Sequence, residues 1–240
     1  MAKRRIEPRK AWGAMQKLLK NPHDTGQVFV IIDALSGNTL GRVTERFKQT
    51  ETGARIAREH RMLLDTLIDR EYLHSLPQGS LGKIYAEFCD REGITADGLV
   101  EASMQGVSRD AGFDDPDRRL VGARLRDMHD LWHVITGYKT DLIGEASVLA
   151  FSVPQTRNPG VAFIVGVVFL RATGELSWAR KVMWEAMVRG ARAEWLPAQD
   201  WEALLALPLD EVRRRLKVGE PRRYYEIRAP RPGQATPKAA

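Results

Sequence analysis

The chain has 240 residues, 43% of them hydrophobic and 28% charged, which excludes a disordered or fibrous protein and allows one large domain or two small ones. Its single cysteine, Cys89, excludes a disulfide framework and a zinc site built from cysteines. Lys and Arg number 37 against 31 Asp and Glu, and the net charge of +6 permits an anionic partner without identifying one.

The excess positive charge lies at the two ends. The first ten residues carry five Lys or Arg and one acid, and the segment from Gly219 carries five Lys or Arg, two acids and four prolines. We expect both ends to be solvated, with a basic segment at 1–19, a helical domain at 20–218 and a Pro/Arg-rich tail at 219–240. Such ends attract an anionic membrane surface, whereas nucleic acid is not an expected partner, because no basic stripe interleaved with aromatics runs through the body.

The longest apolar run, residues 161–170, is too short to cross a membrane. Ten helical residues rise about 15 Å, half of a hydrocarbon core of about 30 Å. No apolar signal-peptide segment follows the basic start of the chain. We therefore expect neither a transmembrane helix nor a signal peptide, in a chain that is soluble or peripheral to a membrane.

Helical periodicity dominates the sequence. Apolar residues recur at helical spacing over residues 54–68, 81–90, 118–135, 142–151, 174–192, 199–207 and 209–218. Capping signals place helix starts at Ser80, at residues 114–117 and at Thr140 or Asp141, and helix ends at Gly93, near Gly137 and before Pro154. Residues 27–32 and 161–170 are rich in β-formers, but neither alternates nor pairs through a hairpin turn. We therefore predict an all-α fold, a single compact helical domain.

One short segment carries the residues from which a metal site can be built. His129 and His133 stand four apart on a predicted helix, so they project from one face about 40° apart, with Asp130 on the neighbouring edge. Gly137 lets the chain turn, and the next helix then brings Glu145 back as a fourth ligand. Two imidazoles with carboxylates and no thiolate suit Zn²⁺, Mn²⁺ or Fe²⁺.

The same residues also allow a simpler interpretation. Two histidines at this spacing are common on ordinary helices, and only the added carboxylates favour a metal. The apolar neighbours Met128, Leu131 and Val134 indicate that the helix is packed inside, where a bare Asp130 is costly without a partner.

Beyond this local pattern, the chain resembles a known family. HDLWH at 129–133, eleven further residues and Glu145 resemble the HDxxHx11E pattern of the coenzyme Q biosynthesis protein 4 family. Further segments resemble that family in the same order, namely SLPQGSLGKIY at 75–85, RDMHD at 126–130, TDLIGE at 140–145, and the closing helices with Trp201-Glu202 and LDEVRRRLKV. The resemblance covers residues 20–218 approximately. ITGY after the second histidine departs from the family's more usual Leu-Leu-Gly type of run, which bears on substrate preference and not on the metal ligands.

The resemblance implies an all-α fold and a divalent metal, generally zinc with manganese or iron as alternatives, held by His129, Asp130, His133 and Glu145. It also implies action at C1 of a polyprenylated benzoquinone precursor, where a metal-dependent decarboxylase/hydroxylase removes the ring carboxyl and installs a hydroxyl. We expect Asp130 and Arg126, in the approach to the motif, to be catalytic. Expected partners are the quinone precursor, other quinone-biosynthesis enzymes and further copies in a homo-oligomer. The expected location is cytoplasmic, peripheral on the cytoplasmic face of the inner membrane.

Four residues are candidates for substrate binding: Ser80, Gly82, Tyr85 and Leu142. Ser80 can cap a helix and Gly82 permits close backbone approach, so this segment is either a tight inter-helix turn or a helix start whose N–H groups face the substrate head group, within reach of Tyr85. Leu142, with Ile143, Leu149, Phe151 and the run 161–170, lines a path for a polyprenyl tail or forms plain helix core.

Two other functions compete with the enzyme. The first is a non-catalytic, lipid-binding scaffold for the quinone enzymes, in which the metal is structural. The second is an HD-type metal phosphohydrolase, suggested by the His-Asp pair, although His133 and Glu145 are surplus to that pattern. Cys89, between apolar neighbours, is expected to be a small buried hydrophobe and not a nucleophile.

Overall fold

The computed structural model describes residues 5–22, 24–94 and 115–226. Over this part of the chain every regular element is a helix, which confirms the all-α prediction, and one isolated antiparallel bridge joins Ser80 to Pro208. The α-helices are α1 (Pro8–Lys20), α2 (Thr25–Leu35), α3 (Thr39–Gln49), α4 (Glu51–Glu59), α5 (Leu63–Leu67), α6 (Arg70–Ser75), α7 (Leu81–Glu92), α9 (Pro116–Asp127), α10 (His129–Thr136), α11 (Leu142–Thr156), α12 (Pro159–Arg171), α13 (Trp178–Arg192), α14 (Trp201–Leu204) and α15 (Leu209–Arg215). Two 3-10 helices, η1 (Gly174–Leu176) and η2 (Leu196–Ala198), complete the set.

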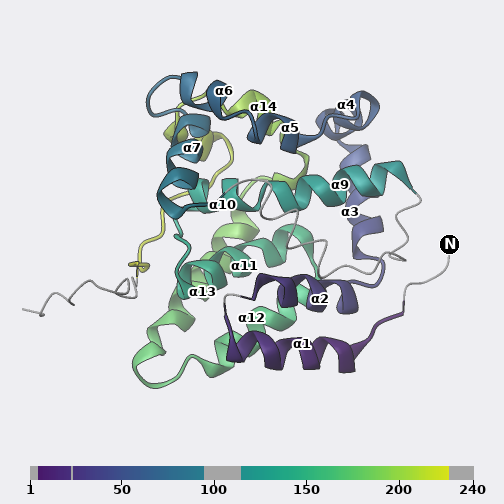
Figure 1. The fold of residues 1–240 in the computed structure, drawn as a ribbon, viewed down its shortest axis with the longest axis vertical. Coiled ribbons are helices and arrows are strands. Elements are labelled where there is room, and N and C mark those ends of the chain that lie inside the picture. The colour runs from purple at the N-terminus through teal and green to yellow at the C-terminus, as the bar shows by residue number, and fades with distance from the viewer. Residues whose placement is uncertain (1–4, 23, 95–114, 227–240) are drawn as a thin grey trace, which may run out of the picture.

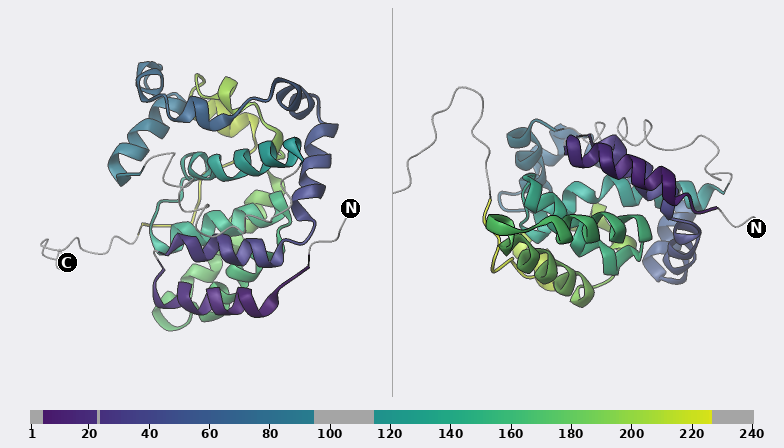
Figure 2. Two further views of the ribbon diagram at one scale, coloured as in Figure 1. Left: turned by 45° about the vertical axis from the view of Figure 1, so that its right-hand side comes forward. Right: turned by 90° about the horizontal axis from the view of Figure 1, so that it is seen from below.

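The helices are stacked in layers around α10 and α11. Figure 1 shows α9 and α10 as one broken rod across the middle of the molecule, with α4 to α7 and α14 on one side and α1, α2 and α12 at the opposite end. Helix α11 packs against α10, α12 and α13, and α1 packs on α2, which in turn contacts α12. The two further views in Figure 2 show the same arrangement, with α1 and α2 stacked at one end. Helix α11 is therefore enclosed by its neighbours.

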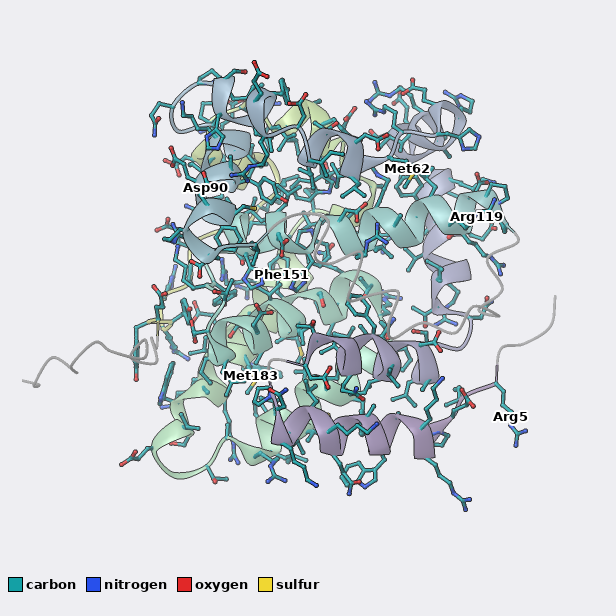
Figure 3. All side chains as sticks on the ribbon, in the orientation of Figure 1. Arg5, Met62, Asp90, Arg119, Phe151 and Met183 are labelled. Atoms are coloured by element: carbon teal, nitrogen blue, oxygen red, sulfur yellow. The ribbon has the colours of Figure 1, made fainter. Side chains whose placement is uncertain are left out.

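The main hydrophobic core surrounds α11. It includes the fully buried Phe151, which lies in the middle of the molecule in Figure 3, and the buried Trp132 of α10, whose ring packs edge-on against it. Helices α11 and α13 approach closely because Gly190 has no side chain, and a Cβ there would lie 2.1 Å from the Phe151 carbonyl oxygen. The crossing holds α11 in a fixed position relative to the rest of the core.

Several predicted helices have different bounds from those expected. The single helix expected at 54–68 is interrupted, because His60 adopts a left-handed conformation at φ 47 between α4 and α5. The helix expected to end before Pro154 continues to Thr156. Its last turn is held from outside, because the Gln155 side chain bonds both the Gly190 carbonyl and the Leu196 N–H. The β-rich runs at 27–32 and 161–170 lie in α2 and α12, where packing overrides propensity.

The described stretches at the two ends of the chain are attached to the helical body. Helix α1 begins at Pro8 and buries Ala11 and Met15 against its neighbours. Residues 219–226 are tied to the body through side-chain hydrogen bonds, although most of them, like residues 5–10, are exposed. Residues 1–4 and 227–240 lie outside the described part of the chain. No helix among the described residues has both the length and the hydropathy needed to cross a membrane.

Candidate metal centre

Helix α10 carries the two histidines on one face. It begins at His129 and ends at Thr136, and the capping residue Gly137 adopts φ 81, the left-handed conformation that glycine reaches without strain. The Nε2 atoms of His129 and His133 lie 3.2 Å apart, with their rings edge to face. The sequence prediction that these side chains converge is therefore confirmed.

The ring of His133 is fixed by two neighbours. Its Nδ1 lies 3.1 Å from the Tyr138 carbonyl oxygen, and because a carbonyl can only accept, Nδ1 carries the hydrogen. Phe88 of α7 stacks on the ring at 5.9 Å between centroids. The Nε2 atom of this buried imidazole therefore faces His129, and a backbone carbonyl holds the ring as in many metal-ligating histidines.

Glu145 reaches the histidines from the next helix. Asp141 caps α11 by accepting the N–H groups of Ile143 and Gly144 at 3.0 and 3.2 Å, so Glu145 lies in the first turn. Its two carboxylate oxygens lie 3.5 Å from Nε2 of His129 and 3.5 Å from Nε2 of His133. Burial opposes ionisation, but the two imidazoles outweigh it and hold the pKa of Glu145 well below its usual range. Glu145 is therefore a carboxylate shared between the two rings.

Asp130 supplies the fourth candidate ligand. One potential ligand atom from each of His129, Asp130 and His133 lies within 4.8 Å of the others. As a residue Asp130 is 5% exposed, and no hydrogen bond to its carboxyl occurs among the described residues. Burial raises the pKa of Asp130, against the opposing effect of the two imidazoles. A buried carboxylate without a donor is costly, and a divalent cation bound to this nitrogen and oxygen set would remove that cost.

The candidate catalytic residue Arg126 points to a different partner. Its guanidinium binds the buried carboxylate of the neighbouring Asp127 at 2.7 Å. Burial raises the pKa of Asp127, and Arg126 opposes that rise. Arg126 is adjacent to the motif in the sequence, but among the described residues it makes no polar contact with the four candidate ligands.

Ser80 and Gly82 serve the start of α7. The Ser80 hydroxyl caps the helix by accepting the Lys83 N–H, while the N–H groups of Leu81 and Gly82 donate to the carbonyls of Leu207 and Leu205 at 2.9 and 2.8 Å. These N–H groups are occupied and do not face a ligand. The interpretation of this segment as a tight inter-helix contact is confirmed, and the interpretation of free helix-start N–H groups is wrong.

Tyr85 and Leu142, the other two substrate-binding candidates, differ in exposure. Tyr85 is buried, and burial followed by the charges of Cys89 and Asp130 raises its pKa. Cys89 is buried as expected, and burial raises its pKa to about 11. Leu142, the first residue of α11, is 54% exposed one turn before Glu145. Of the other tail-path candidates, Ile143 and Phe151 belong to the core.

The structure also shows residues that the sequence did not indicate. The last carbonyls of α10 are all occupied: Arg213 donates to Ile135 and Val134 at 3.0 and 3.3 Å, and Arg189 donates to Thr136 at 2.8 Å. The remaining carbonyl, that of His133, accepts the Gly137 N–H. Because these partners come from α13 and α15, far along the chain, no local pattern signals them.

Comparisons with known proteins identify the family of this chain. Residues 10–222 match the family model described as coenzyme Q (ubiquinone) biosynthesis protein Coq4. Proteins named ubiquinone biosynthesis protein coq4, mitochondrial, from Talaromyces stipitatus and Aspergillus flavus are each 31% identical over 189 residues, 78% of this chain. The match spans 63% of those relatives, less than two thirds of their length. A crystal structure from Nostoc punctiforme, labelled as a candidate ubiquinone biosynthesis protein, shares the fold with TM-score 0.62 at 22% identity and covers 89% of this chain and 99% of its own.

Proposed function

The chain belongs to the coenzyme Q (ubiquinone) biosynthesis protein Coq4 family, and we propose that it acts in ubiquinone biosynthesis as a metal-dependent enzyme at C1 of a polyprenylated benzoquinone precursor. One observation carries the metal part of this proposal. Potential ligand atoms of His129, Asp130 and His133 lie within 4.8 Å of one another, and the Glu145 carboxylate lies 3.5 Å from both imidazole Nε2 atoms. Asp130 is 5% exposed and has no hydrogen-bond donor among the described residues. The pathway assignment rests on the family.

The four side chains divide between a buried and an open side. His133 and Asp130 are buried, while His129 and Glu145 are 26% and 42% exposed at the side chain. A substrate would therefore approach past His129 and Glu145, beside the exposed Leu142. A metal held by these residues supplies Lewis-acid polarisation of ring oxygens such as a carboxylate and a phenolate.

The proposed conversion replaces the ring carboxyl by a hydroxyl. Carbon dioxide leaves, a hydroxyl oxygen is added, and the ring is oxidised by two electrons, so dioxygen or another oxidant must accept them. Asp130, as a charged candidate ligand, would set how strongly the metal polarises the substrate. Arg126, which contacts Asp127, remains a candidate catalytic residue. Zinc suits the donor set, with manganese and iron as alternatives.

We also propose a peripheral location on a membrane bearing the quinone precursor. The fungal relatives are named mitochondrial, and the basic ends of this chain suit the cytoplasmic face of an inner membrane with anionic lipid. Further copies of the chain and other quinone-biosynthesis enzymes are the proposed protein partners.

A scaffold function is the second candidate. Trp12 and Trp184 are 50% and 60% exposed, and large exposed aromatics are typical of protein contact surfaces. In that case the same four residues would hold a structural metal. The phosphohydrolase is not favoured, because among the described histidines outside the motif His74 pairs with Asp90 on the surface and His60 lies in a turn.

Metal analysis tests the proposed site. The protein should bind one divalent ion per chain. Glu145→Ala and His133→Ala should both reduce binding, because the first removes the carboxylate that lies beside both imidazoles and the second removes one of those imidazoles. His74→Ala, an exposed histidine paired with Asp90, is the matched control and should bind like wild type. Equal metal in all four proteins would reject the site. Turnover of a carboxylated prenylphenol by the purified protein then separates enzyme from scaffold.

A further inference from the structure

We propose that Tyr224 is a positioning residue that sets the distance between the histidines of α10 and Glu145 of α11. The inference rests on the proposed function in one respect, since it takes these side chains to hold a cation. Tyr224 belongs to the segment 219–226, which is part of the predicted Pro/Arg-rich tail at 219–240. Its hydroxyl occupies the turn that joins the two ligand-bearing helices.

The hydroxyl of Tyr224 contacts both ends of this turn. It accepts the N–H of Lys139 at 3.1 Å and donates to Oδ2 of Asp141. It also abuts the first turn of α11, since a Cβ on Gly144 would lie 2.9 Å from the hydroxyl oxygen. The Tyr138 ring packs edge-on against the Tyr224 ring at 5.2 Å. The residue is therefore wedged between the end of one helix and the start of the next.

These bonds form one continuous chain between candidate ligands. The peptide unit joining Tyr138 to Lys139 accepts the His133 Nδ1 hydrogen at its carbonyl and donates its N–H to Tyr224. Tyr224 donates to Oδ2 of Asp141, and Oδ1 of Asp141 accepts the first N–H groups of α11, one turn before Glu145. Hydrogen bonds in such a series polarise and orient one another. The chain thus connects the ring of one candidate ligand to the helix that carries another.

The segment that carries Tyr224 is itself held in place. The Gly219 carbonyl accepts a bond from Arg189, and the Arg222 N–H donates to Glu185 at 2.8 Å. Beyond Tyr224, the Tyr225 ring stacks on Trp178 of α13 at 4.3 Å and 18°. The hydroxyl is consequently presented from a segment anchored before and after it, and it can fix the turn against α13.

Removing only the hydroxyl tests this role. Tyr224→Phe keeps the ring against Tyr138 but breaks the series of hydrogen bonds between His133 and α11. Tyr225→Phe is the matched control, because the Tyr225 ring stacks on Trp178 and its hydroxyl makes no hydrogen bond among the described residues. Changing residues that hold metal ligands typically weakens metal binding about 10- to 100-fold. We expect Tyr224→Phe to weaken Zn²⁺ affinity by about 10-fold, in competition with a chelating dye, and to shift the absorption spectrum of bound Co²⁺.

A second measurement uses the metal-free protein. Amide hydrogen exchange should accelerate at Lys139, Ile143 and Gly144 in Tyr224→Phe and remain unchanged in Tyr225→Phe. Wild type that binds no Zn²⁺ would reject the proposed function, while the exchange data would still decide whether Tyr224 fixes the turn. Unchanged exchange in Tyr224→Phe would overturn the inference. So would Zn²⁺ affinity equal to that of Tyr225→Phe in a protein that does bind the ion.

General destabilisation is controlled by a variant in another part of the fold. Phe47→Leu lies in a separate hydrophobic cluster with Val43 and Ile56, and it leaves the turn untouched. At equal loss of thermal stability, Phe47→Leu should keep the wild-type Zn²⁺ affinity and Co²⁺ spectrum. Equal weakening of Zn²⁺ binding in Phe47→Leu and Tyr224→Phe would show that the hydroxyl acts only through global stability, and would overturn the proposal.

Discussion

Replacing Asp130 by Asn should change stability in opposite directions with and without metal. In the metal-free protein Asp130 is 5% exposed as a residue, and among the described residues its carboxylate receives no hydrogen bond. An unsatisfied buried polar group costs about 1–3 kcal/mol, and more when it is charged. Asn at this position keeps the size of the side chain and removes the charge. Metal-free Asp130→Asn should therefore unfold with a free energy at least equal to that of wild type, and up to about 3 kcal/mol greater.

Bound metal should reverse this order. A ligand that binds only the folded state stabilises it by about 2.7 kcal/mol at a concentration 100 times its dissociation constant. Wild type should gain this amount with Zn²⁺, whereas Asp130→Asn lacks a charged candidate ligand and should gain less. If the metal is catalytic, the variant should also fail to restore quinone synthesis in a strain lacking this protein, despite its intact fold.

The assay is urea unfolding of both proteins, with chelator and with saturating Zn²⁺, beside complementation of that strain. His74→Ala serves as the control, because its side chain lies on the surface with Asp90. A metal-free variant that is less stable than wild type by more than about 1 kcal/mol, the value of an ordinary hydrogen bond, would show that the carboxylate is satisfied without a cation. Full quinone levels with the variant at normal expression would refute the catalytic role.

Three further predictions concern the surroundings of the site. Arg213→Ala should lower the unfolding free energy by about 1–3 kcal/mol in urea melts, because two buried carbonyls of α10 lose their donor, and the exposed Arg214→Ala should change it little. Gly190→Ala should cost about 1–3 kcal/mol by forcing α11 and α13 apart, whereas Gly166→Ala, which meets no atom within 4 Å, should be neutral or stabilising. Cys89, whose pKa burial raises to about 11, should resist alkylation at pH 8 in the folded protein and react after unfolding in urea, as mass spectrometry would show.

The parts of the site that could be predicted depend on short-range signals. The spacing of His129 and His133 determines their common face in any helix, and Gly137 and Asp141 mark a helix end and a helix start from their own chemistry. Together they place Glu145 near the imidazoles without knowledge of the rest of the fold. This expectation matches the structure because each of these three signals is local in the sequence.

The parts that could not be predicted depend on distant partners. Pro154 normally ends a helix, and only the bonds of Gln155 to Gly190 and Leu196 reveal why α11 continues. The chain that follows the interruption at His60 is also held by a distant residue, since Asp200 binds Arg61 across the fold. Such tertiary contacts are not recorded by periodicity along the chain.

The residue that we propose to position the candidate ligands lies outside the motif that contains them. The family match ends at residue 222, and all four candidate ligands lie between His129 and Glu145. Tyr224 lies beyond that match, yet its hydroxyl joins the His133 peptide contact to the cap of α11. A chain ending at residue 218 would keep every candidate ligand and lose this bond. Its metal affinity should therefore fall toward that of Tyr224→Phe, even though no residue of the motif has changed.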